Sequence, residues 1–224
     1  MKQRPFLISG FIGLAVIVMS LVNMRLFPQS SPGRIAGIAS PIIAFEFAKT
    51  PAEIEALFGP AGSPARQVMA AAMDRGNRAD YLYMLLYSAF LFSFAWTAVK
   101  QTGQKWLVAG MVLAALALVG DALENVQLLQ ITAVLDTSKF GATLTRLHWF
   151  TWLKWGSLAL YFLLMAGYFW GNGRFGKLIA VMGGLTFLLG LASFIRRGPT
   201  TEPFTFAVAA MFLLMIIYSF IKKE

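Results

Sequence analysis

Long apolar runs separated by short polar stretches make up most of this chain. A helix rises about 1.5 Å per residue, so roughly 20 apolar residues can cross the ~30 Å hydrocarbon core of a bilayer. The pattern predicts an all-α fold, a polytopic transmembrane helical bundle of about six spans. We expect the spans at residues 5–27, 80–99, 106–131, 147–170, 178–195 and 204–221.

The segment 28–79, between the first two expected spans, contains several signals for short helices. Four dipeptides each place a capping residue before a proline suited to the first helical position: Ser31-Pro32, Ser40-Pro41, Thr50-Pro51 and Ser63-Pro64. Thr50 and Glu53 have the spacing of a capping box, and Gly59 is suited to end that short helix. We therefore expect a short helical segment outside the membrane.

Two parts of this external segment need separate treatment. Residues 35–48 are too short to span and too apolar for a solvated loop, which predicts a re-entrant or interfacial helix. A helix starting at Pro64 could run on into the second span, with Gly76-Asn77 as the place where it could break.

Composition supports a membrane protein made of one transmembrane domain, residues 1–224. The 224 residues are 58% hydrophobic and 13% charged, with a mean hydropathy of +0.68, which excludes a disordered chain. The absence of cysteine excludes disulfides, thiolate metal sites and cysteine nucleophiles. A single histidine excludes a metal site built from several imidazoles.

The net charge of +9 comes from basic residues scattered at span ends rather than gathered on one face, so we expect no nucleic-acid partner. Membrane lipids are the expected partners of these side chains. The positive-inside rule predicts cytoplasmic termini, because one side of the bundle carries the larger basic set. That set is Lys2, Arg4, Lys100, Lys105, Arg174, Lys177, Lys222 and Lys223, against Lys139, Arg146, Arg196 and Arg197 on the other side.

Asp121, Glu124 and Asn125 interrupt the third apolar run. Their i, i+3, i+4 spacing places them on one helical face. An ionisable group in hydrocarbon costs about 2.5–3.5 kcal/mol by insertion scales, so it usually faces a bundle interior. Small residues precede the three on the same face: Gly110, Ala114 and Ala117. This face should pack against neighbouring helices.

The expected topology brings other polar groups to the same depth. Asp121 lies about 24 Å along the helix from Lys105, in the outer leaflet. Asp80 and His148 open the second and fourth spans from the outside, and Lys154 lies about two turns beyond His148. Glu46 belongs to the external segment that should fold over this rim. Tyr87 shares a helical face with Asp80, either to hydrogen-bond into the site or only to pack.

Negative groups outnumber positive ones in this expected pocket, so a proton, water or a cation must accompany them. We expect it to bind a small cationic or amphiphilic, lipid-like ligand. Asp121 and Glu124 would be the counter-charges, Lys154 their internal partner, Asn125 a further polar contact, and Asp80 and Glu46 the rim. No cofactor is expected, although a divalent cation could occupy such a site.

Two other classes of function remain open. An intramembrane metal-dependent lipid hydrolase could use Asp80, Asp121, Glu124 and His148 as ligands, since oxygen donors and one imidazole suit Mg, Mn or Zn. A structural or assembly subunit, with partner membrane proteins, would use the same network only as scaffolding.

Several short motifs are similar to those of an uncharacterised family of small bacterial polytopic membrane proteins. They are Phe45-Glu46-Phe47-Ala48, Thr50-Pro51 with Glu53, Asp80-Tyr81, Gly120-Asp121 with Glu124-Asn125, and Lys154 in the next span. The resemblance covers roughly residues 40–155. It implies a bacterial cytoplasmic (inner) membrane protein and brings no settled activity.

Overall fold

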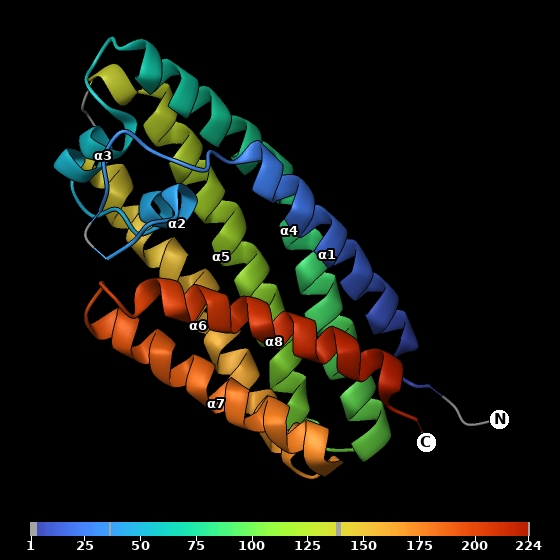
Figure 1. The fold of residues 1–224 in the computed structure, drawn as a ribbon. Helices are drawn as coiled ribbons and strands as arrows, with labels where there is room; N and C mark the ends of the chain where they lie inside the picture. The colour runs from blue at the N-terminus through green and yellow to red at the C-terminus, as the bar shows by residue number, and fades with distance from the viewer. Residues whose placement is uncertain (1–3, 36, 138–139, 224) are drawn as a thin grey trace.

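A computed structural model describes residues 4–35, 37–137 and 140–223, and the helices account for most of them. Lys2 and Lys139, both used in the topology prediction, lie outside the described residues. The helices are α1 (Leu7–Leu26), α2 (Pro41–Glu46), α3 (Pro51–Phe58), α4 (Pro64–Thr102), η1 (Lys105–Leu107), α5 (Val108–Ala133), η2 (Leu135–Thr137), α6 (Gly141–Trp170), α7 (Gly173–Ile195) and α8 (Thr201–Ile221) (Figure 1). The predicted all-α fold is confirmed.

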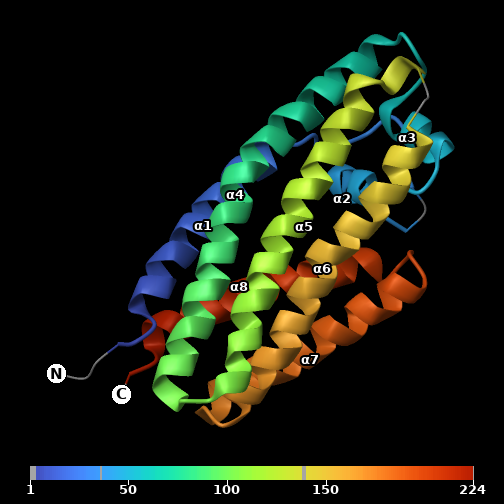
Figure 2. The ribbon, with the colours of Figure 1, turned by 180° about the vertical axis from the view of Figure 1, so that it is seen from behind.

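Three long helices, α4, α5 and α6, run side by side through the bundle (Figure 2). The other spans pack around them: α1 lies against α4, α7 lies against α6, and α8 contacts both α7 and α1. The two termini lie at one end of the bundle, here called the terminal end (Figure 1). The α2–α3 segment, residues 40–59, here called the cap, lies in the half remote from the termini (Figure 1).

Among the described residues, five helices are long and apolar enough to cross a membrane: α1, α4, α7, α8 and the continuous pair η1–α5. These indicate a multi-pass integral membrane protein. The fourth expected span, residues 147–170, corresponds to α6, which is 30 residues long and packs along α5 and α7. It falls outside the apolar set because its first half carries Arg146, His148 and Lys154.

The external segment differs from the prediction in one place and agrees with it in another. The expected helix at 35–48 is reduced to α2, which begins only at Pro41, and Ile35 and Ile38 instead form an isolated antiparallel bridge. The helix from Pro64 runs on into the second span, so the possible break at Gly76-Asn77 does not occur and α4 is 39 residues long. Gly76 instead gives the Phe27 ring room to pack against α4.

The predicted capping of α3 is confirmed. The Thr50 hydroxyl accepts a hydrogen bond from the Glu53 backbone N–H at 3.3 Å, the Glu53 carboxylate accepts one from the Thr50 backbone N–H at 3.3 Å, and Gly59 ends α3 at φ +86°. The cap is packed on its own apolar cluster, which includes Phe45, Phe58 and Leu147. Its helices are therefore held in place by local capping and by burial.

Two charged side chains, Arg197 in the loop between α7 and α8 and Glu202 in α8, connect the cap to this part of the bundle. Arg197 donates to the carbonyl of Phe47 at 2.5 Å and to the Glu53 carboxylate at 3.0 Å. Glu202, in the first turn of α8, accepts from the backbone N–H groups of Ala39 (2.8 Å) and Ser40 (2.6 Å). The cap is thus fixed over the starts of α6 and α8 rather than hanging free.

Candidate functional site

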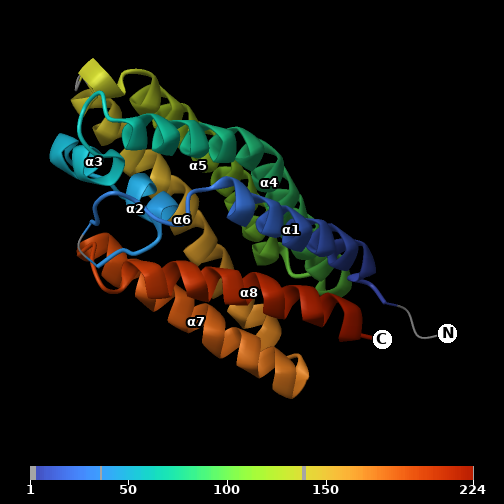
Figure 3. The same cartoon turned by 45° about the horizontal axis from the view of Figure 1, so that its top comes forward.

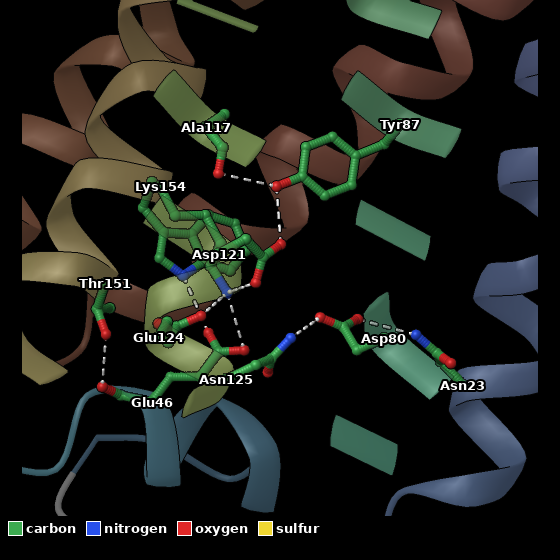
Figure 4. Close-up of polar contacts among 11 residues, drawn as sticks. Asn23, Glu46, Asp80, Tyr87, Ala117, Asp121, Glu124, Asn125, Thr151 and Lys154 are labelled. Carbon is green, nitrogen blue, oxygen red and sulfur yellow. Dashed lines mark hydrogen bonds and ion pairs between the residues drawn. The ribbon is translucent and has the colours of Figure 1, made fainter. Parts of the chain in front are cut away.

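The ammonium of Lys154 lies at the centre of a buried charged cluster (Figure 4). Its Nζ is 3.1 Å from Glu46 Oε1 and 3.3 Å from Asp121 Oδ1, and it also contacts the Glu124 carboxylate. Lys154 is 5% exposed and Glu124 is fully buried. Three elements therefore supply one cluster: α2 through Glu46, α5 through the two other carboxylates, and α6 through the lysine.

Close packing of α5 on α6 makes this contact possible. The predicted small-residue face of α5 is buried, and it continues through Gly120 to Asp121, Glu124 and Asn125. A Cβ at Gly120 would lie 2.5 Å from the backbone nitrogen of Lys154. The missing side chain lets the two backbones approach at the level where the charges meet.

The cap contributes Glu46 with a defined orientation. Its Oε2 accepts a hydrogen bond from the Trp155 indole N–H at 3.0 Å, and its backbone carbonyl accepts from Thr151 at 3.1 Å. Burial raises the pKa of the Glu46 carboxyl above its ordinary value of 4.5, and the adjacent Lys154 ammonium only partly offsets this. Glu46 therefore binds protons more readily than an exposed glutamate.

Asp80 in α4 is held by two side-chain amides. Asn23 of α1 donates to its Oδ1 at 3.0 Å, and Asn125 of α5 donates to its Oδ2 at 2.9 Å (Figure 4). The sequence prediction missed Asn23, although an amide in the last turn of an otherwise apolar span is the same kind of signal that identified Asn125. The first span thus joins the site.

Tyr87 hydrogen-bonds into the cluster, which decides between the two roles considered for it. Its hydroxyl lies 2.7 Å from Asp121 Oδ2 and donates to it, with the carbonyl of Ala117 at 3.4 Å (Figure 4). Tyr87 is 3% exposed. Its ring also packs edge-on against Phe212, so Tyr87 connects the charged cluster to an apolar side chain of α8.

A cavity of about 220 Å³ opens beside these groups. Its lining includes polar side chains: Asn23, Glu46, Asp80, Tyr83, Tyr87, Asp121, Lys154 and Trp155. It also includes the apolar side chains Phe27, Ile42, Ile43, Leu158, Val208, Ala209 and Phe212, together with the hydroxyls of Ser20 and Thr205. Such a mixture of a few converging polar groups and an apolar surface is typical of small-ligand sites.

Most of the hydrogen-bond donors that line this cavity already have protein acceptors. The Lys154 ammonium faces three carboxylates, and the Trp155 N–H and Tyr87 O–H each donate to one. The hydroxyls of Ser20 and Thr205 donate to carbonyls of their own helices, Ser20 to Val16 and Thr205 to Glu202, each at 2.9 Å.

Acceptors are left over. Asn23 is 7% exposed and lines the cavity, and its buried Oδ1 has no hydrogen-bond partner. Glu124 is not among the residues that line the cavity, and its Oε1 is also buried with no hydrogen-bond partner among the described residues. Buried acceptors without donors cost free energy. The cavity wall is therefore short of donors and suits a group that supplies them.

Net charge points the same way. Four carboxylates, those of Glu46, Asp80, Asp121 and Glu124, lie in one network. Within the described part of the chain, Lys154 is the one cationic side chain that forms ion pairs with them. The excess of carboxyl groups over cationic groups predicted from the sequence is therefore present in the described part of the folded protein.

His148 lies apart from this network, unlike every other predicted site residue. It lines a separate surface pocket with Lys49, Leu144 and Thr145. Six residues separate it from Lys154, and at about 100° per residue this places the two side chains roughly 120° apart around α6. Among the residues that the structure describes, no three His, Asp or Glu side chains form a group that could hold a metal ion.

Comparison of the chain with protein-family models, with curated proteins and with solved structures finds no match. The cavity and its donors and acceptors are therefore the basis for the function proposed below.

Proposed function

We propose that this multi-pass membrane protein binds a small cationic or amphiphilic ligand, with an ammonium group held in the acidic cavity. The observation that carries the proposal is the mismatch among the described groups that line the cavity: they include three carboxyl groups but one cationic side chain, and the Asn23 Oδ1 lacks a donor. A primary ammonium supplies up to three N–H donors and one positive charge. It would satisfy both deficits at once.

Each polar residue then has a role. Asp80 and Asp121 provide the counter-charges that face the cavity, and the free Oδ1 of Asn23 accepts one further N–H. Lys154 stays paired with Glu124, and this ion pair holds the carboxylates together when no ligand is bound. Glu46 closes the site from the cap. The volume of about 220 Å³ suits a headgroup-sized moiety rather than a large molecule.

The proposal includes a location. We place the protein in a bacterial inner membrane, with cytoplasmic termini and the cap and cavity toward the outer face. The excess of basic residues at the terminal end, among them Lys100, Lys105 and Arg174, supports this orientation through the positive-inside rule. Lipids would surround the apolar side chains exposed on the spans.

Binding should depend on pH in a defined direction. As pH falls through the raised pKa of Glu46, its carboxylate takes up a proton and no longer attracts a cation. Affinity for an ammonium ligand should therefore be highest above this raised pKa and should decrease as pH falls through it.

The test uses dodecylamine and protein in phosphatidylcholine nanodiscs. A ligand that binds only the folded state at 100 times its Kd stabilises it by about 2.7 kcal/mol, so the unfolding midpoint should rise. Asp80→Asn and Asp121→Asn should each weaken binding about tenfold or more. Glu55→Gln, which removes a carboxylate on α3 outside the cavity lining, should bind as the unmodified protein does.

Dodecanoate serves as the ligand control, because it has the same chain and the opposite charge. Equal stabilisation by dodecanoate and dodecylamine, or unchanged amine binding in both aspartate variants, would overturn the proposal.

A further inference from the structure

Helices α1 and α8 are in close contact at the terminal end. A Cβ at Gly10 would meet the ring of Phe220 at 2.9 Å, and a Cβ at Gly13 would lie 2.5 Å from Ile216. Phe11 adds an edge-on ring contact with Phe220, with centroids 5.7 Å apart. The two glycines thus allow the helices to approach closely where both chain ends lie.

The same helices separate toward the cap (Figures 1 and 3). The register of the glycine contacts would place Ser20 of α1 opposite Ala209 of α8. Instead of packing on each other, these two residues both line the acidic cavity. Asn23 and Thr205 do so one turn further on. The cavity therefore occupies the gap between the diverging helices.

The edges of this gap are apolar and exposed. Ala209 lines the cavity and is itself exposed, and Phe206 beside it on α8 is 71% exposed. On α1, Leu21 is 57% and Met24 is 58% exposed. Side chains of this kind on a membrane helix face hydrocarbon rather than water. The gap thus connects the carboxylates to the side of the bundle that would contact lipid.

From these observations we infer that the ligand is a bilayer amphiphile: its ammonium lies in the cavity, and its hydrocarbon chain leaves sideways between α1 and α8. The inference rests on the proposed function and names its substrate class, an alkylammonium lipid. Charge complementarity fixes the headgroup, and the continuity of the cavity with the apolar gap fixes the direction of the chain. A water-soluble amine would have no use for the gap.

A second opening offers a competing route. A groove of about 300 Å³ runs between the end of α1 and the start of α2, and it shares Ser20, Asn23, Phe27 and Ile42 with the cavity. Gln29 and Ser40 lie along its outer part. This route leads toward the cap loop and would suit a soluble ligand, so the experiment must separate the two.

The experiment uses an alkylamine of twelve carbons with a diazirine near the far end of its chain. The protein is irradiated in phosphatidylcholine nanodiscs with this probe, and adducts are located by mass spectrometry. We expect adducts on Leu21, Phe206 and Ala209 that excess dodecylamine removes. Competed adducts on Gln29 or Ser40 would overturn the lateral route.

A matched pair of variants adds a measurement of affinity. Ala209→Trp narrows the lateral gap and should weaken dodecylamine binding about tenfold and butylamine binding much less. Gln29→Trp, in the outer groove, should change neither. Equal affinity of the unmodified protein for both amines would overturn the inference and leave the proposed function standing. Failure of both amines to bind would remove the proposed function as well.

Discussion

The terminal end and the cap end of the bundle are built from the same helices but packed by different means. At the terminal end, glycines and aromatic rings make a dry contact, as in the cluster of Phe6, Phe94, Phe169 and Tyr218. At the cap end, α1 and α8 diverge around a cavity, and charged side chains hold α2, α5 and α6 together. The first region is packed without a cavity of this kind, and the second contains the candidate site.

This difference follows from what each type of contact tolerates. Ring and glycine packing stabilises through close contact and leaves no room for a ligand. In a buried charged network every group needs a partner, and a group without one lowers the stability of the protein. A bound molecule that supplies missing partners should therefore stabilise the cap end more than the terminal end.

The largest expected effect comes from removing the central cation. Lys154→Met leaves the carboxylates of Glu46, Asp121 and Glu124 without their shared partner, which should destabilise the protein by about 3–5 kcal/mol. Thermal unfolding in detergent measures the change. At the terminal end, Lys100→Met removes an exposed ammonium 4.8 Å from the Trp96 ring and should change stability by less than about 0.5 kcal/mol. Similar midpoints for both variants would contradict the asymmetry between the two ends.

Glycine substitutions give an intermediate effect. Gly120→Ala pushes a methyl group against the backbone of α6 and should cost about 1–3 kcal/mol, with weaker binding of dodecylamine because Lys154 is displaced. Gly13→Ala at the terminal end meets the side chains of Ile216 and Phe90 rather than a helix backbone, and it should cost less because side chains shift more easily than backbone.

Gly156→Ala is the matched control for these two, since nothing lies within 4 Å of its new methyl group. It should be neutral or slightly stabilising, because alanine favours helix by about 1 kcal/mol over glycine. Chemical unfolding ranks the three variants. A Gly120→Ala protein as stable as Gly156→Ala would show that the close approach of α5 and α6 is not required.

The smallest effect concerns the link between the cap and Arg197. Partial burial acts to raise the pKa of Glu53, but hydrogen bonds from Arg197 and from the backbone N–H of Lys49 outweigh it, so the pKa lies below 4.5. Glu53 thus contributes stability that is fully present above pH 4.5 and is lost as pH falls through its lowered pKa.

Glu53→Gln should therefore remove this part of the acid dependence, a difference of about 1 kcal/mol or less for a partly exposed pair. Stability of both proteins is measured from pH 7 to pH 3. Parallel curves would mean that the cap does not depend on the ion pair.

The sequence predicted several parts of the site because each depends on a local pattern. The i, i+3, i+4 spacing of Asp121, Glu124 and Asn125 places them on one helical face in any fold that keeps the helix. The excess of carboxyl groups at this depth follows from the predicted topology. Asn23 could have been identified in the same way as Asn125, because each is an amide within an apolar span. His148 was assigned by depth alone, and its position around the helix axis placed it elsewhere.

By itself, the sequence determined an all-α fold with apolar spans, the capping of α3, and the buried face of α5. These depend on helical periodicity, capping chemistry and the cost of polar groups in hydrocarbon, all of which act within one segment. Only the tertiary structure decided that Gly120 brings Lys154 against α5, that Asn23 completes the site, and that α1 and α8 diverge. Those depend on contacts between segments distant in the chain, which no local pattern encodes.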